Sequence, residues 1–110
     1  MLEASKEEVL EELRQRVKGP ETEINVIDMG LVYEVNLEDD RISVDLTAPS
    51  RESPQTGQVA AEVETVLRSA FEVNVEVNIV WDPPWDPQMI TEEGLEALQK
   101  EKKGSLRFLN

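Results

Sequence analysis

The chain has 110 residues, enough for one hydrophobic core but too few for two, so we assign residues 1–110 to a single domain. Its formal charge of -13, from 24 acidic and 11 basic residues, argues against nucleic acid and anionic membranes as partners. The sequence holds no cysteine and no histidine, which excludes disulfides, thiolate chemistry and the usual zinc sites.

The amino-terminal residues 1–6 lack the apolar centre of a signal peptide. No apolar run approaches the ~20 residues that a membrane helix needs. We therefore expect a cytoplasmic location.

A first helix is predicted from Ser5 to Lys18. Ser5 and Glu8 form a capping-box pattern, in which a side chain at each position binds the backbone of the other. Apolar residues then recur at helical spacing, at Val9, Leu10, Leu13 and Val17. Gly19-Pro20 ends the helix.

Two strands follow, over residues 31–37 and 41–47. Apolar and polar side chains alternate in both, as in a strand with one buried face. The polar turn at 38–40 makes an antiparallel hairpin the simplest arrangement.

A second helix is predicted to begin at Ser53, as its N-cap, with Pro54 at the first helical position. A third strand comes next. The predicted core face of the helix is Val59, Val63, Val66, Leu67 and Ala70, and the inward residues of the strand are Val73, Val75, Val77, Ile79 and Trp81.

The segment from Trp81 to Pro87 cannot continue a central strand, because each proline removes a hydrogen-bond donor, so it is predicted to be a stiff turn. Thr91 then caps a last, short helix that carries Leu95 and Leu98. Residues 104–110 are expected to form a flexible tail, in which Leu106, Phe108 and Leu109 are candidates for docking on the core or on a partner.

The order α-β-β-α-β-α predicts an α+β class, a two-layer domain in which helices cover a three-stranded mixed sheet. This topology brings one set of residues to the same end of the sheet, beside strand ends and a helix N-terminus. The candidate functional edge comprises Glu21, Asp28, Thr47, Ser53 and Trp85.

No catalytic set is visible at this edge, since a serine without a histidine or a nearby lysine is a poor nucleophile. Structural roles compete with functional ones: Asp28 as a turn residue, Glu21 as a solvated acid and Thr47 as a backbone-binding residue. Trp85 is expected either to pack on the last helix or to be presented to a partner.

Several segments resemble the SufT/PaaD-like family of iron-sulfur cluster assembly factors, also named the MIP-eighteen-like family. The resemblance covers residues 8–98 and is carried by four stretches, Pro20-Glu21, residues 25–33, Leu46-Thr47-Ala48-Pro49 with Ser53-Pro54, and residues 81–87. It implies an iron-sulfur cluster assembly domain-like fold and a role in cluster assembly, as a protein that is not an enzyme.

In this family a cysteine precedes the proline that opens the second helix, where the helix dipole favours the thiolate that iron prefers. Ser53 occupies that position here, Gly19 replaces the first residue of the family's acidic pair, and the loop from Thr47 to Ser53 is about two residues longer. We therefore predict no catalytic, metal-binding or cofactor-binding residue in this chain, and a cluster only with a partner's ligands.

The function implied by the resemblance is a maturation factor that binds apo-proteins or other iron-sulfur assembly proteins; a homodimer stays open. The alternative is an accessory subunit of a multicomponent oxygenase, as in the phenylacetate branch of the family, or of another metabolic complex. A third hypothesis is an enzyme that uses Ser53, Glu21 or Asp28.

Overall fold

The structure is a computed structural model and describes the backbone of residues 4–108 and the side chains of residues 4–101. Its elements follow the predicted order. They are α1 (Lys6–Arg16), β1 (Val32–Glu38), β2 (Arg41–Leu46), α2 (Thr56–Phe71), β3 (Asn74–Ile79), the 3₁₀ turn η1 (Pro87–Met89) and α3 (Glu92–Phe108). The predicted α+β class and the α-β-β-α-β-α order are confirmed.

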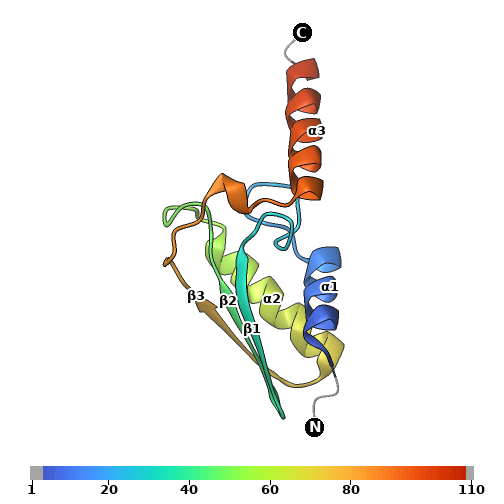
Figure 1. The fold of residues 1–110 in the computed structure, drawn as a ribbon, viewed down its shortest axis with the longest axis vertical. Helices are drawn as coiled ribbons and strands as arrows, with labels where there is room; N and C mark the ends of the chain where they lie inside the picture. Colours follow the sequence, from blue (N-terminus) through green and yellow to red (C-terminus); the bar gives the residue numbers. More distant parts are fainter. Residues whose placement is uncertain (1–3, 109–110) are drawn as a thin grey trace.

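The sheet has the order β1-β2-β3, so β2 is central and the other two strands are edges. β1 runs antiparallel to β2, and β3 runs parallel to β2. Figure 1 shows α1 and α2 packed beside the sheet, whereas α3 lies beyond one end of it and points away. None of the described helices is long and apolar enough to span a bilayer.

One apolar cluster joins the two helices to the sheet. All inward side chains of the central strand, β2, are buried in this cluster. Its outward positions carry the polar residues Arg41, Ser43 and Asp45. Apolar residues with no more than 1% of their surface exposed are Val9, Leu13 and Val17 around α1, Val26 and Leu31 before β1, Ile42, Val44 and Leu46 in β2, and Val63 and Leu67 in α2. Such burial is the main stabilising contribution in a domain of this size.

The first helix has the predicted cap, and the second does not. The Ser5 hydroxyl accepts from the Glu8 amide at 3.1 Å, and the Glu8 carboxylate accepts from the Ser5 amide at 3.3 Å. α2 begins at Thr56, and Gln55 precedes it without a side-chain cap, so the prediction of Ser53 as N-cap is wrong. The reason is local: the chain makes a tight turn after Ser53, in which the Thr56 amide donates to the Ser53 carbonyl at 3.4 Å.

Three residues after the second strand, which were predicted to face the core, are at least partly exposed. Ile79 is 40% exposed, because an edge strand is covered from one side only, and Trp81 lies beyond the strand and is partly exposed. Ala70 is exposed and lines an open hollow between α1 and α2 that its methyl group does not fill.

The last helix is longer than predicted, since α3 runs from Glu92 to Phe108. Leu98 packs against the core as expected, but Leu95 is 44% exposed. The expected tail at 104–110 is helical in its backbone as far as Phe108. The expected docking of Leu106, Phe108 and Leu109 concerns side chains that lie outside the described residues.

Candidate functional site

Segments from all parts of the chain meet at the end of the sheet where β2 and β3 finish. The Thr47 amide donates to the Leu31 carbonyl at 2.8 Å, which joins the end of β2 to the segment before β1. The proline-rich segment crosses this end of the sheet, because the Tyr33 hydroxyl donates to the Pro83 carbonyl at 2.9 Å. Figure 1 shows the same crossing from β3 towards α3.

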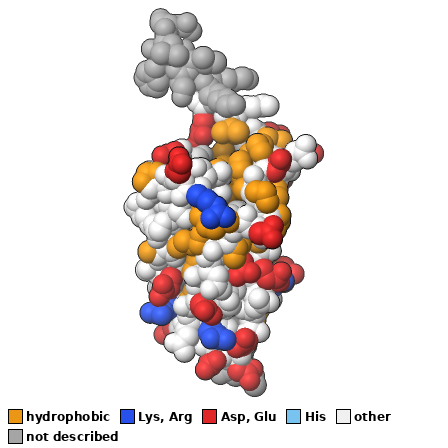
Figure 2. Space-filling model, turned by 90° about the vertical axis from the view of Figure 1, so that its left-hand side faces the viewer, with side chains coloured by type: hydrophobic (Ala, Val, Ile, Leu, Met, Phe, Trp, Pro, Cys, Tyr) orange, Lys and Arg blue, Asp and Glu red, His pale blue; other side chains and the backbone are white. Residues whose placement is uncertain are grey.

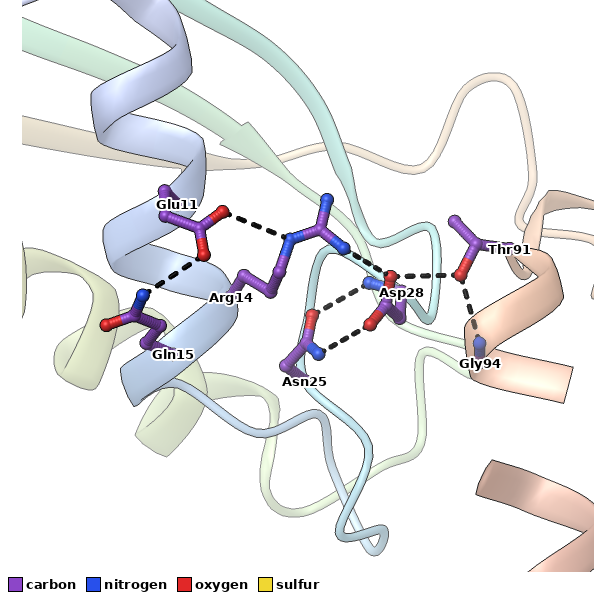
Figure 3. A network of polar contacts seen from close by, with 7 residues as sticks. All are labelled: Glu11, Arg14, Gln15, Asn25, Asp28, Thr91 and Gly94. Atoms are coloured by element: carbon purple, nitrogen blue, oxygen red, sulfur yellow. Dashed lines mark hydrogen bonds and ion pairs between the residues drawn. The ribbon is translucent and has the colours of Figure 1, made fainter. Parts of the chain in front are cut away.

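Asp28 is the centre of a polar network drawn in Figure 3. Its side chain is buried, and its Oδ1 accepts from Arg14 Nη1 at 3.0 Å and from Thr91 Oγ1 at 2.9 Å. Its Oδ2 accepts from Asn25 Nδ2 at 2.8 Å, while the Asp28 amide donates to Asn25 Oδ1 at 2.8 Å. One carboxylate therefore ties α1 to the loop before β1 and to the start of α3.

Two glycines allow the backbone to approach closely around Asp28. Gly30 has φ +74°, and a Cβ there would lie 2.4 Å from the Met89 carbonyl oxygen. Gly94, in the first turn of α3, has no room for a Cβ either, because the Asp28 carbonyl oxygen would lie 2.6 Å away. The glycine of the Asp-x-Gly pattern, Gly30, thus lets the loop before β1 pass close to the backbone of Met89. Only glycine can combine the left-handed conformation with so short a distance.

The Ser53 hydroxyl is buried and has no hydrogen-bond partner among the described residues, and the same is true of the Thr47 hydroxyl at the end of β2. Thr47 is only 2% exposed. Two unsatisfied hydroxyls in one region are unusual, since buried polar groups are nearly always paired. Ser53 therefore has no base beside it that could activate it as a nucleophile.

Glu21 lies at the start of α2 and away from the Asp28 network. It has φ 59° and an exposed side chain, and its amide donates to Gln55 Oε1 at 2.6 Å. It lines a shallow hollow together with Thr22, Glu23, Gln55 and Glu101.

The carboxylate of Glu101, on α3, helps to close this hollow. It accepts from the Thr22 hydroxyl at 3.1 Å and from the Glu23 amide at 2.7 Å. Beside the hollow, a hydrogen bond and the negative charge of Glu23 raise the pKa of the Lys18 ammonium group above its ordinary value.

The two tryptophans have different surroundings. Trp85 is half-buried against the core, and its Nε1 donates to the Met29 carbonyl at 2.8 Å. Trp81 instead stacks with the Arg51 guanidinium, whose carbon lies 5.2 Å from the ring centre. Trp85 thus pins the proline-rich segment to the loop before β1.

The structure therefore divides the predicted edge into parts. Asp28 and Trp85 lie around the loop before β1, whereas Glu21 and Ser53 lie around the turn into α2. The contacts of Arg14 and Thr91 with Asp28, and that of Glu101 with Thr22, were not predicted, because the partners are distant in the chain. Within residues 4–101, no group of three or more acidic side chains is placed to hold a metal ion.

Comparison with known proteins places the chain in a family. The model of the family described as "Iron-sulfur cluster assembly protein" matches residues 6–79, which spans α1 to the end of β3. The chain belongs to this family. The resemblance inferred from the motifs is thereby confirmed, and the chain holds no cysteine.

Three relatives show how far the similarity extends. The Staphylococcus aureus protein named "Fe-S protein maturation auxiliary factor SufT" is 41% identical over 77 residues, which covers 68% of this chain and 88% of the relative. The Bacillus subtilis factor YitW, named in the same way, is 37% identical over 76% of this chain and 83% of its own length. A crystal structure from Bacillus anthracis, titled as a domain of unknown function, superposes with a TM-score of 0.81 at 28% identity, over 89% of this chain and 94% of that one.

Proposed function

We propose that this member of the iron-sulfur cluster assembly family is a non-enzymatic maturation factor that holds protein partners and carries no cluster on ligands of its own. The cluster is then cargo, held by thiolates of the partner. The relatives named as maturation auxiliary factors support the first half of this proposal. The partnerless Ser53 hydroxyl, in a chain without cysteine or histidine, carries the second half.

The donor atoms at this site do not fit an iron-sulfur cluster. Iron in clusters is bound by thiolate sulfur, and a serine hydroxyl stays protonated near neutral pH and is a poor ligand for a soft metal site. Among the described residues Asp28 is the one buried carboxylate, and its two oxygens already accept from Arg14, Asn25 and Thr91.

The same contacts argue against catalysis by the predicted edge. A nucleophile needs a base within hydrogen-bond reach, and the Ser53 hydroxyl has no hydrogen-bond partner among the described residues. Asp28 is held in a structural network, and the Glu21 side chain is exposed at the start of α2. Of the three, Asp28 joins α1, the loop before β1 and the start of α3 through its carboxylate.

Affinity purification under native, anaerobic conditions tests the proposal. We expect the tagged chain to retain apo-proteins that receive clusters, or components of the assembly machinery, identified by mass spectrometry. A tagged variant of Asp28→Ala, in which the crossing is disrupted, is the matched control and should retain less. Retention of oxygenase subunits in their place would favour the accessory-subunit alternative, and retention of neither by a folded chain would contradict the proposal.

A further inference from the structure

The free edge of β3 differs from the other edge of the same sheet. At β1, the register shifts between Val32 and Glu34, and the Lys6 ammonium lies 3.6 Å from the Glu34 carboxylate across that edge. A bulge and a charged side chain are two devices by which proteins block pairing at an edge strand. β1 is therefore protected.

β3 has no bulge, and its one charged side chain, Glu76, lies 3.8 Å from the guanidinium group of Arg41 on the neighbouring β2. Its register with β2 is continuous from Asn74 to Ile79, and the strand contains no proline and no lysine. Within the described residues its only strand neighbour is β2. Ile79, at its end, exposes 40% of its surface. Such an edge is a template for pairing with another chain.

The hydrogen bonds on either side of β3 show which groups face outwards. The Asn74 amide donates to the Asp40 carbonyl at 3.1 Å, and the Val80 amide donates to the Leu46 carbonyl at 2.9 Å. Even-numbered residues therefore turn their backbone groups to β2. Because backbone groups alternate along a strand, Val75, Val77 and Ile79 turn their N–H and C=O groups to the free edge.

Apolar surface continues from the end of this strand. Figure 2, which faces the β3 side of the molecule, shows hydrophobic side chains gathered over its upper half around a basic group. Trp81 follows the strand and stacks with Arg51, while Pro83 and Pro84 are exposed. A chain that paired with β3 would run alongside this surface.

The charges on the sheet indicate what kind of chain pairs there. On the face turned away from the helices, Glu76 of β3 lies beside β2 and β1, which carry the acids Asp45, Glu34 and Glu38 against the single base Arg41. A second copy would bring another formal charge of -13 and a second Glu76 to this edge. Like charges across neighbouring strands are destabilising, whereas lysine or arginine there is stabilising.

We propose that the free edge of β3 binds an extended segment of a partner protein, in which β-branched apolar residues alternate with lysine or arginine. The segment adds a fourth strand: its apolar side chains extend the row of Val75, Val77 and Ile79, and its basic side chains lie beside Glu76. This inference rests on the proposed function, because it assigns the surface by which the partner is held.

A synthetic peptide, Lys-Val-Lys-Val-Lys-Val-Lys with blocked ends, tests the proposal on the full chain. We expect the peptide to bind and to shift the amide signals of Val75, Val77 and Ile79 in NMR spectra. The control peptide has the same sequence with an N-methyl group on every residue, which keeps the charge but removes the backbone donors whichever way the peptide runs. It should bind about tenfold more weakly or worse, since several hydrogen bonds are lost.

Two protein variants give an independent test. Val77→Pro removes an amide that faces the free edge and not β2, so we expect the variant to fold and to lose peptide binding about tenfold. Val77→Ala keeps the amide and should bind within about threefold of the parent chain. Circular dichroism checks that both variants are folded. The comparison with the N-methylated peptide uses the parent chain and so does not depend on the folding of a variant.

Equal binding of the N-methylated peptide, shifts confined to another surface, or a dimer of the parent chain that Val77→Pro dissociates would each overturn the proposal. The outcome is separate from that of the proposed function. If Val77→Pro retains cluster recipients as well as the parent does, the edge proposal fails and the function stands. If the peptide binds β3 but no recipient or assembly protein is retained, the function fails.

Discussion

The Ser53 hydroxyl costs stability, because on folding it loses water and gains no hydrogen-bond partner from the part of the chain that the structure describes. A thiol in the same place would tolerate burial better, since free cysteine behaves as a small hydrophobic side chain. A methyl group or a thiol at position 53 would therefore be easier to bury than the serine hydroxyl. The family resemblance implies a cysteine at this position.

Replacing Ser53 with alanine is therefore expected to raise the free energy of unfolding, by about 1 kcal/mol, because it removes a buried unsatisfied group. Ser5→Ala is the control, since Ser5 is a true N-cap with both capping-box bonds, and it should lower stability by about 1 kcal/mol. Urea denaturation measures both. A loss of stability in Ser53→Ala would show that the hydroxyl has a partner after all.

At the scale of elements, α3 is held to the rest of the domain at two places, by Thr91 before its first turn and by Glu101 further along the helix. Thr91 joins it to Asp28, and its hydroxyl also accepts from the Gly94 amide at 3.0 Å. Glu101 ties it to Thr22 and to the Glu23 amide. The direction in which α3 leaves the sheet is therefore set by the loop before β1.

Gly94→Ala is expected to lower the free energy of unfolding by about 1 to 3 kcal/mol, although alanine favours helices, because its methyl group would collide with the Asp28 carbonyl. Gly57→Ala, in the first turn of α2, meets nothing within 4 Å and should be neutral or stabilising by up to about 1 kcal/mol. Thermal unfolding compares the two. Equal effects would mean that α3 can shift to make room.

For the whole molecule, the structural features that depend on residues close together in the chain were predicted correctly from the sequence. The α1 cap, the hairpin and the parallel crossover follow from local patterns, and each is present. The Asp28 network was not predicted, because Arg14 and Thr91 lie 14 and 63 positions away in the chain. Ser53 was misread as a cap because a Ser-Pro pair before a helix looks the same whether the helix begins at that proline or two residues later.

Iron and sulfide content per chain after anaerobic reconstitution tests the central claim, that this protein holds partners without a cluster ligand of its own. We predict that the parent chain binds neither, that Ser53→Cys gains weak iron or cluster binding, and that Ser69→Cys, on an exposed position of α2, gains none. A stoichiometric cluster on the parent chain alone would contradict the account.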